Sequence, residues 1–440
     1  MTLKELQEKA HKVLLGNHNP DGFTIPCEGL YPFQWNWDSG FIAIGWAHVD
    51  MDKAKQEIAT LLKAQWGNGF IPHIVFHKES DTYFPGADFH QSELHPLAPV
   101  KYKTTGMTQP PVLGFVLEEL LRIADDKKDV LAFIKTQIDA VYKYNVYLYE
   151  QRDPQNEGLV YVYHNWESGT DNSPVWDGIL QRMVAPQYTF ERKDTTHVDA
   201  SQRPTNDEYN KYVHIIEVAK KHNYSDEKIV ELSPLLVQDP LFNSMLIASN
   251  HSLIRLYEMI GGNEDKIEHL QTYNNKAISS FNNKLWDEDL QAYIYYDLRN
   301  EESIPMITSS SFSPLFAKIP DQEKAVKLLR TLHTKFGKEG QYLCASFDPT
   351  SEDFKAKKYW RGPIWINLNW LIYRGLQRYH FVEMADRVKS DTVDLLQQYG
   401  FYEYFDIRRE IHEKNEGAYG GNNFSWSAAL LLDILKDKNE

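Results

Sequence analysis

The 440-residue chain is long enough to bury a large core, and its mean hydropathy of −0.53, with no long apolar run, excludes a transmembrane protein. Its 62 acidic and 47 basic residues give a formal charge of −15, which repels phosphate backbones and anionic lipid headgroups. Nucleic acids and membranes are therefore not expected as partners. Cys27 and Cys344 are too few for a disulfide framework or a four-thiolate zinc site, so no metal or other cofactor is expected.

The first residues, MTLKELQEKAHKVLLGN, are polar and amphipathic and lack the basic and apolar regions of a secretory signal. We therefore expect a cytoplasmic protein, and the sequence leaves homo-oligomerisation open. The aromatic content is high, with 11 Trp, 26 Tyr and 21 Phe. Because flat aromatic faces stack on the C–H surfaces of sugars, this composition favours a carbohydrate ligand.

Helical periodicity runs through almost the whole chain. Apolar residues recur at spacings of three and four over residues 3–14 and again over 54–64. Further helices are predicted over 39–49, 112–125, 127–150, 208–221, 225–237, 241–261, 264–285, 321–336, 362–378, 381–399 and 424–437. No Ser/Gly or Pro linker divides the chain, so a single domain over residues 1–440 is expected.

About twelve amphipathic helices in one all-α domain can close as two concentric rings, an (α/α)6 barrel. The alternative, an open α-solenoid, normally carries a sequence repeat that this chain lacks. The long segments 66–111 and 151–207 are rich in Gly, Pro, Asn and Asp, yet too hydrophobic to be disordered. The pattern therefore predicts a barrel whose long loops form a lid over a central pocket.

The first dense aromatic cluster lies at residues 31–41, where Trp35 and Trp37 precede Asp38 at a predicted helix start. One interpretation of Asp38 is a helix N-cap and nothing more. Two indoles beside a carboxylate favour a sugar subsite instead, in which the rings stack on the sugar and the acid binds its hydroxyl groups.

A second cluster, at residues 165–177, contains three carboxylates and two tryptophans. A carboxyl group flanked by indoles is poorly solvated, which raises its pKa and lets it stay protonated as a general acid. Asp171 is the predicted acid, although Asp-Asn-Ser-Pro is also a typical turn sequence. Glu167 and Asp177 are then structural or supporting carboxylates.

A third cluster, at residues 400–406, places Glu403 among four aromatic side chains. Glycoside hydrolysis needs a second carboxylate that activates water or attacks the anomeric carbon, and Glu403 fits this role. The alternatives are that Glu403 is a surface acid on an edge strand, or that Glu416 takes the role. Glu416 is the weaker candidate, since its Gly-rich surroundings at 415–423 are typical of a mobile loop.

Two segments place an arginine near aromatic residues: Arg361 follows Tyr359 and Trp360, and Arg203 stands six residues before Tyr209. In a chain of net charge −15, an anionic substrate needs a local cation, and a guanidinium group matches a carboxylate through two hydrogen bonds. On this pattern alone, an ordinary salt bridge is the favoured interpretation of Arg203.

Taken together, these segments resemble the (α/α)6-barrel glycoside hydrolases of family 63 and the related trehalases, from about residue 25 to residue 430. The Glu-Ser-Gly-x-Asp core at 167–171 is shared with trehalases, and the resemblance implies that Asp171 is the general acid. The segment 403–406 is similar to the stretch that carries the family's general base, which implies Glu403. Family members invert the anomeric configuration, so the two carboxyl groups should lie roughly 6.5–9.5 Å apart.

Within the family, the chain is most similar to mannosylglycerate and glucosylglycerate hydrolases. The segment from Arg203 to Tyr209 resembles one that holds the glycerate carboxylate, and the resemblance implies Asp38 and Arg361 at the subsite for the cleaved sugar. Thr170 departs from the bulkier Trp or Met of relatives, which implies a roomier pocket around the acid. Other positions that match the family's pocket are Tyr31, Trp37, Tyr83, Gln109, Tyr359, Trp360 and Trp365.

The expected activity is therefore the inverting hydrolysis of mannosylglycerate or glucosylglycerate to a hexose and glycerate. Three alternatives stay open. One is an α-glucosidase that acts on a neutral disaccharide or oligosaccharide. Another is a sugar epimerase or isomerase that uses a histidine such as His73, His90 or His95 as proton shuttle. The third is a sugar-binding protein without catalytic activity.

Overall fold

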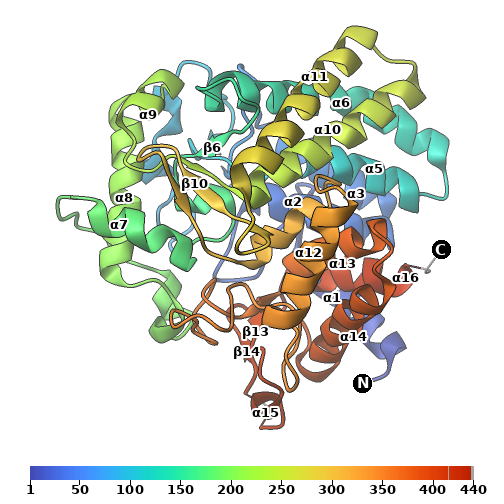
Figure 1. Ribbon diagram of the computed structural model, residues 1–440. Coiled ribbons are helices and arrows are strands. Elements are labelled where there is room, and N and C mark those ends of the chain that lie inside the picture. Colours follow the sequence, from blue (N-terminus) through green and yellow to red (C-terminus); the bar gives the residue numbers. More distant parts are fainter. Residues whose placement is uncertain (415, 438–440) are drawn as a thin grey trace.

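Six helical elements form a closed inner ring in the computed structural model, which describes residues 1–414 and 416–437 (Figure 1). Each element contacts the next along the chain, and the last contacts the first. In chain order they are α2 (Asn36–Ala47), α5 (Leu113–Ile123), α10 (Pro240–Ile260), η7 (Ser309–Leu315), α13 (Ile366–Arg378) and α16 (Ser425–Lys436). The ring is the core of the molecule, since residues 36–46 of α2 and 425–434 of α16 are all buried.

A second layer of helices surrounds the ring. The helices α3, α6, α11 and α14 each pack against the inner helix that precedes them in the chain, and α1 packs against α16. These outer helices bury one stripe only; α12, for example, buries Ala325, Leu328 and Thr331. The outer helices are α1 (Leu3–Asn17), α3 (Met51–Leu62), α6 (Lys127–Arg152), α11 (Glu264–Ser280), α12 (Gln322–Thr331) and α14 (Val382–Tyr399). Two concentric layers of this kind confirm the predicted (α/α)6 barrel.

The two ends of the chain meet in the barrel wall. Figure 1 shows α1 and α16 side by side, and Asn17 at the end of α1 donates from Nδ2 to Ser425 Oγ over 2.9 Å. The last inner helix is thereby fixed to the first outer one. Among residues 1–414 and 416–437, no helix combines the length and the apolar character that crossing a bilayer requires.

The fourth position of the inner ring differs from the sequence-based expectation. Helical periodicity predicts no helix over residues 309–315, yet the short 3₁₀ helix η7 lies there and packs against α10 and α13. The segment is rich in serine, which favours caps and turns, and Pro314 interrupts it. Tertiary packing, and the side chain of Thr308 that accepts from the Ser310 N–H, hold it in place.

Two predicted helices have wrong boundaries. The helix expected over 225–237 ends at Leu232, because Ser233 precedes Pro234 and is extended, with ψ 131°. The helix expected over 362–378 begins only at Ile366, because residues 364–365 form a strand. The remaining predicted helices agree with the structure to within a few residues. Those expected over 264–285 and 321–336 finish in the π-helical turns η6 (Phe281–Leu285) and η8 (Leu332–Phe336).

Short strands, which the all-α prediction did not include, fasten the loops at one end of the ring. The strands β3 (Gln34–Trp35), β7 (Val237–Gln238) and β12 (Ile364–Trp365) directly precede α2, α10 and α13. Strands of two or three residues are too short to show a recognisable alternation of polar and apolar residues. All pairs are antiparallel. Within the described chain, two sheets have two strands each: β1 (His18–Asn19) with β2 (Phe23–Thr24), and β8 (Trp286–Asp287) with β9 (Ala292–Tyr293). The larger sheets have the strand orders β3–β4–β5, β6–β7–β10–β11 and β12–β13–β14, where β4 is Ile74–Phe76, β5 Lys103–Thr104, β6 Tyr161–Val162, β10 Tyr295–Asp297, β11 Glu302–Ile304, β13 Tyr404–Phe405 and β14 Ala418–Tyr419.

The long connecting segments also contain short helices. The helix α8 starts at the end of the segment 151–207, and α9 follows it; Figure 1 shows both helices on one side of the barrel. The helices outside the two rings are α4 (Ala87–His90), η1 (Ser92–Leu94), η2 (Asn165–Ser168), η3 (Pro174–Trp176), α7 (Asp177–Arg182), η4 (Asp194–Thr196), η5 (Ala200–Gln202), α8 (Asn206–Lys221), α9 (Asp226–Leu232) and α15 (Arg409–His412).

Ring closure depends on a close approach of α2 to α16. A Cβ atom on Gly45 would lie 2.3 Å from Ala429 Cα, so Gly45→Ala should force the two helices apart and destabilise the protein by about 1–3 kcal/mol. Gly16→Ala is the matched control, because no atom lies within 4 Å of its Cβ position; the gain in helix propensity should stabilise by about 0.5–1 kcal/mol. Thermal unfolding of both variants measures the difference. Equal midpoints for Gly45→Ala and wild type would contradict this account of ring closure.

Candidate functional site

A pocket lies at the end of the barrel where the inner helices begin. The starts of α2, α13 and α16 and the loops that carry Asp171 and Glu403 all contribute to its lining. Every predicted site residue except Arg361 lines it, although these residues are spread over most of the sequence. They are Tyr31, Trp37, Asp38, Tyr83, Gln109, Asp171, Arg203, Tyr209, Tyr359, Trp360, Trp365 and Glu403.

The loop that carries Asp171 is pressed against the start of α2. It follows the 3₁₀ helix η2 and turns at Gly169, whose φ is +75°. A Cβ atom on Gly169 would lie 2.5 Å from the indole of Trp37, so only glycine fits this turn. Asn165 then donates from Nδ2 to the backbone oxygen of Asp171 over 2.6 Å. The carboxyl group is held at the pocket wall by this local structure.

The Asp171 carboxyl group has few hydrogen-bond donors. Tyr359 Oη donates to its Oδ2 over 3.3 Å. Burial raises the pKa of Asp171 to about 7, although the charge of Arg203 and the hydrogen bond from Tyr359 act in the opposite direction. A substantial fraction of Asp171 is therefore protonated at neutral pH, as a general acid requires.

Glu403 precedes β13, which is the central strand of the sheet β12–β13–β14. It is 1% exposed, so the interpretation as a surface acid on an edge strand is wrong. Its carboxylate accepts from Tyr31 Oη over 2.8 Å and from the N–H of Gly421 over 3.0 Å, and Arg203 Nη1 lies 3.9 Å away. Burial raises the pKa of Glu403, and Arg203, Gly421 and Tyr31 oppose this rise by stabilising the anion.

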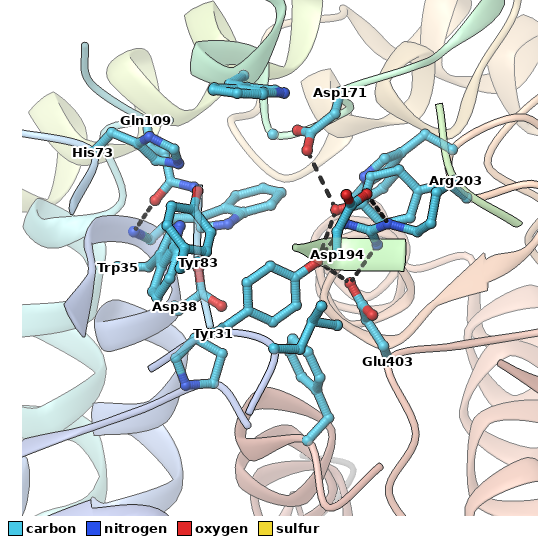
Figure 2. A pocket seen from close by; sticks show the side chains of 18 of the residues that line it. Tyr31, Trp35, Asp38, His73, Tyr83, Gln109, Asp171, Asp194, Arg203 and Glu403 are labelled. Atoms are coloured by element: carbon cyan, nitrogen blue, oxygen red, sulfur yellow. Dashed lines mark hydrogen bonds and ion pairs between the residues drawn. The ribbon is translucent and has the colours of Figure 1, made fainter. Parts of the chain in front are cut away.

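Two phenols join the acidic groups. The hydroxyl groups of Tyr31 and Tyr359 lie 3.1 Å apart, and each contacts one carboxyl group. Figure 2 shows Asp171 and Glu403 directed into the pocket from different loops, with the Tyr31 side chain reaching toward Glu403. Because contacts of 3.3, 3.1 and 2.8 Å connect Asp171 Oδ2 to Glu403 Oε1, these oxygens are at most about 9 Å apart.

Arg203 provides the positive charge beside both phenols. Its Nη2 donates to Tyr31 Oη over 3.2 Å, its Nε donates to Asp194 Oδ2 over 3.2 Å, and its guanidinium carbon lies 4.0 Å from the centre of the Tyr359 ring. Its Nη1 is buried and makes no hydrogen bond among the described residues. Arg203 is thus more than a surface salt-bridge partner: it is buried at the pocket, and its Nη1 makes no hydrogen bond to a described residue and faces Glu403 Oε1 at 3.9 Å.

Asp194 was not predicted from the sequence. It lines the pocket and receives hydrogen bonds from Arg203 and from Arg192, whose Nη2 is 2.7 Å from Asp194 Oδ2. Burial alone would raise the pKa of Asp194, but the two arginines hold it below the ordinary value. The only signal in the sequence is its place in the long segment 151–207, which does not separate it from the other acids there.

The other acidic candidates are now distinguishable. Asp38 lies in the first turn of α2, which begins at Asn36, so Asp38 is not the N-cap of this helix. Its side chain is buried, with 4% exposed, and burial raises its pKa well above the ordinary value. Glu167 is buried and accepts from the N–H of Tyr163 over 2.8 Å, with Arg152 Nη1 3.4 Å away, so it holds the loop together. Glu416 is exposed and does not line the pocket.

The expectation for Arg361 is not met, since the structure places it outside the pocket lining. Its Nη1 and Nη2 donate to the two carboxylate oxygens of Asp177 over 2.8 and 2.6 Å, and Nη1 also lies 3.4 Å from the backbone oxygen of Asn172. The carboxylate of Asp177 draws the guanidinium group behind the wall. Arg361 therefore supports the loop that follows Asp171.

Aromatic side chains make up much of the wall. Trp360 and Trp365 stack with ring centres 3.6 Å apart and planes 5° apart, and Trp37 meets Trp426 edge to face. Gln109 accepts from the Trp37 N–H over 3.1 Å, which fixes the start of α2. The lining also includes Trp35 and Trp166, which belong to the two aromatic clusters seen in the sequence, His73, and two residues that were not predicted, Phe424 and Trp426. In the described part of the chain, no group of three His, Cys, Asp or Glu residues is arranged to hold a metal ion.

Comparisons with known proteins agree over the whole barrel. A family model described as a mannosylglycerate hydrolase MGH1-like glycoside hydrolase domain matches residues 31–427. A mannosylglycerate hydrolase from Thermus thermophilus is 38% identical over 426 residues, which cover 96% of this chain and 99% of that protein. A glucosylglycerate hydrolase from Mycolicibacterium hassiacum is 31% identical over 448 residues, covering 99% of this chain and 98% of that protein.

The similarity extends to a solved structure. The crystal structure of a GH63 mannosylglycerate hydrolase from Thermus thermophilus, in complex with Tris and D-glycerate, matches with a TM-score of 0.90 at 36% identity. The match covers 98% of this chain and 100% of that chain.

The raised pKa of Asp171 has a consequence for stability. Asp171 has a pKa of 3.8 in the unfolded chain and about 7 in the folded protein. Between these two pH values the unfolded chain releases a proton that the folded protein keeps, so Asp171 destabilises the fold increasingly as the pH rises through this range. Asp171→Asn removes the effect. Its melting temperature relative to wild type should therefore rise between pH 4 and pH 7.5 in thermal scans. A difference that is constant across this range would contradict the burial of an ionisable Asp171.

Proposed function

Since this chain belongs to the mannosylglycerate hydrolase MGH1-like glycoside hydrolases of family 63, we propose that it hydrolyses mannosylglycerate or glucosylglycerate to a hexose and glycerate. We further propose that residues 1–440 act as one catalytic domain, with Asp171 as general acid and Glu403 as general base. The observation that carries this assignment is the pair of carboxyl groups in one aromatic pocket, joined by the hydroxyl groups of Tyr31 and Tyr359.

The surroundings of the two carboxyl groups suit different roles. Asp171 is protonated in part at neutral pH and donates its proton to the glycosidic oxygen as the bond to the sugar breaks. Glu403 receives two hydrogen bonds and faces Arg203, and these groups favour the anion that removes a proton from the attacking water. Burial raises the pKa of both acids, and the greater number of donors around Glu403 is the feature that suits it to the role of base.

The arrangement of the acids is compatible with inversion. An inverting enzyme needs about 6.5–9.5 Å between its carboxyl groups so that water fits beside the anomeric carbon, whereas a retaining enzyme needs about 5–5.5 Å. The upper limit of about 9 Å, together with two phenolic oxygens placed between the carboxyl groups, is compatible with the first arrangement. Water then attacks from the face opposite the leaving glycerate, and no covalent sugar intermediate forms.

The pocket offers complementary groups for both halves of the substrate. The stacked indoles of Trp360 and Trp365, with Trp37, provide flat surfaces for the hexose, and Asp38 provides a carboxyl group for its hydroxyl groups. Arg203 Nη1, which lacks a hydrogen-bond partner, would bind the glycerate carboxylate. Arg361 pairs with Asp177, and its proposed part is to support the loop that follows Asp171.

The alternatives have weaker support. Of the three histidines considered as proton shuttles, only His73 lines the pocket, and burial lowers its pKa well below the ordinary value. A neutral oligosaccharide would bring no carboxylate to Arg203 Nη1, which makes no hydrogen bond to a described residue and has only the more distant Glu403 Oε1 at 3.9 Å. A binding protein without activity would not require two differently solvated acids in contact with the same pair of phenols.

The catalytic assignment is tested with the two conservative variants. Asp171→Asn and Glu403→Gln should each reduce glycerate release from mannosylglycerate or glucosylglycerate by at least about 10²–10⁴-fold, because one proton transfer is lost.

Wild-type kcat/KM should fall as pH rises above about 7, where Asp171 loses its proton. Proton NMR of fresh product should show the β-hexose from the α-linked substrate. Near-normal turnover by either variant, or an α-hexose as first product, would refute the assignment.

The role of Arg203 is tested by comparing charged and neutral substrates. In Arg203→Ala, kcat/KM for mannosylglycerate should fall about 10–100-fold more than kcat/KM for a neutral α-mannoside, because a charged hydrogen bond is worth roughly 1.5–3 kcal/mol. Arg192→Ala is the matched control: Arg192 also pairs with Asp194 but does not line the pocket. An equal loss on both substrates in Arg203→Ala would show that Arg203 acts only on the catalytic groups.

A further inference from the structure

Each inverting turnover leaves the two carboxyl groups in the wrong protonation states. Asp171 has given its proton to the glycosidic oxygen, and Glu403 has taken one from water. The hydrolysis itself is balanced, but the enzyme is not ready for the next substrate. One proton must return from Glu403 to Asp171 before the following cycle. This requirement rests on the proposed roles of the two residues.

Few protein groups around Glu403 can take that proton. The residue is 1% exposed, and its carboxylate contacts Tyr31 Oη, the N–H of Gly421 and the guanidinium group of Arg203. A backbone N–H and a guanidinium group have no lone pair available to accept a proton. A phenolic hydroxyl both donates and accepts. Tyr31 is therefore the only one of these contacts that can take the proton and pass one on.

The path from Tyr31 ends at the acid. Tyr31 Oη lies 3.1 Å from Tyr359 Oη, and Tyr359 Oη lies 3.3 Å from Asp171 Oδ2. The backbone of Tyr359 has a φ of +41°, a conformation that tyrosine rarely adopts and that persists only where the surroundings fix it. The ring is in addition covered by Arg203 at 4.0 Å. The phenol is thus held in place between Tyr31 and the acid.

We propose that Tyr31 and Tyr359 form a proton relay that returns the proton from Glu403 to Asp171 after each turnover. Glu403 Oε1 gives its proton to Tyr31 Oη, Tyr31 gives its hydroxyl proton to Tyr359 Oη, and Tyr359 gives its hydroxyl proton to Asp171 Oδ2. Three O–H bonds break and three form. Both phenols end neutral, a single negative charge moves from Asp171 to Glu403, and no other reactant is consumed.

The electrostatics of the pocket favour this direction and a concerted transfer. Burial raises the pKa of both tyrosines well above the ordinary value, so a free phenolate is a poor intermediate and the three protons move together. Arg203 donates to Tyr31 and covers Tyr359, which stabilises negative charge as it passes. The negative charge finishes on Glu403, where Gly421 and Arg203 stabilise it.

Removal of one hydroxyl group breaks the relay without removing the ring. In Tyr359→Phe, the ring under Arg203 stays. The steady-state kcat for mannosylglycerate in dilute, non-coordinating buffer at pH 7 should fall at least tenfold more than the rate constant of a single turnover with enzyme in excess. Imidazole at constant ionic strength should restore kcat, because it carries the proton from Glu403 to Asp171 through the pocket. A loss that is the same in both measurements, or that imidazole does not restore, would overturn the relay.

Two further variants separate the relay from a binding role. Tyr31→Phe should show the same dependence on imidazole, and the double variant should be no more dependent than either single variant, because one break stops the transfer. Tyr83→Phe is the matched control: this phenol also lines the pocket but makes no contact in the chain of hydroxyl groups, so imidazole should not raise its kcat. Imidazole dependence in Tyr83→Phe would contradict the relay. Failure of wild type to release glycerate would refute the proposed function instead.

Discussion

The proposed mechanism depends on one electrostatic constraint: two carboxyl groups share a poorly hydrated pocket, and their proposed roles require different protonation states. Water would give both nearly the same pKa, so the protein has to distinguish them by hydrogen bonds. Glu403 accepts hydrogen bonds from the N–H of Gly421 and the hydroxyl of Tyr31, whereas Asp171 has a single longer contact with Tyr359, and the charge of Arg203 acts on both groups. In the proposed mechanism, this difference in donors distinguishes the base from the acid, since both groups are buried.

Those donors lie on loops at the end of the barrel where the inner helices begin. Short strands directly precede α2, α10 and α13 and pair with these loops, so residues far apart in the sequence are brought together. Glu403 is held by β13 between two partner strands, and the Asp171 loop is held against Trp37 through Gly169. Arg361 contributes from behind by pairing with Asp177 in the same loop. Most of the side chains that surround the acids therefore belong to the scaffold and not to flexible surface segments.

The sequence predicted those features that leave a pattern of their own. Helical periodicity identified most of the barrel, and aromatic residues clustered around acids identified Asp171 and Glu403 as pocket residues. Pairing between distant segments leaves no such pattern, which is why the two-residue strands and η7 were missed. The same reason explains Asp194 and Arg361. Asp194 is held at the pocket by Arg203, nine residues away in the same irregular segment, and Arg361 is held by Asp177, 184 residues away; neither pair has a spacing that a helix or strand pattern reveals.

The pocket also resolves a conflict between the charge of the protein and that of its proposed substrate. A chain of formal charge −15 repels an anion at long range, yet glycerate carries a carboxylate. Within the pocket, burial raises the pKa values of Asp38 and Asp171, which disfavours their charged forms, and Arg203 lies beside the carboxylates of Asp194 and Glu403. The desolvation that raises the pKa of Asp171 thus also lowers the local negative charge that an anionic substrate meets. Coulomb interactions are weakly screened in a buried site, whereas exposed charges are strongly screened beyond a Debye length of about 8 Å. The charged groups of the pocket therefore act on a bound substrate more strongly than the distant surface charges do.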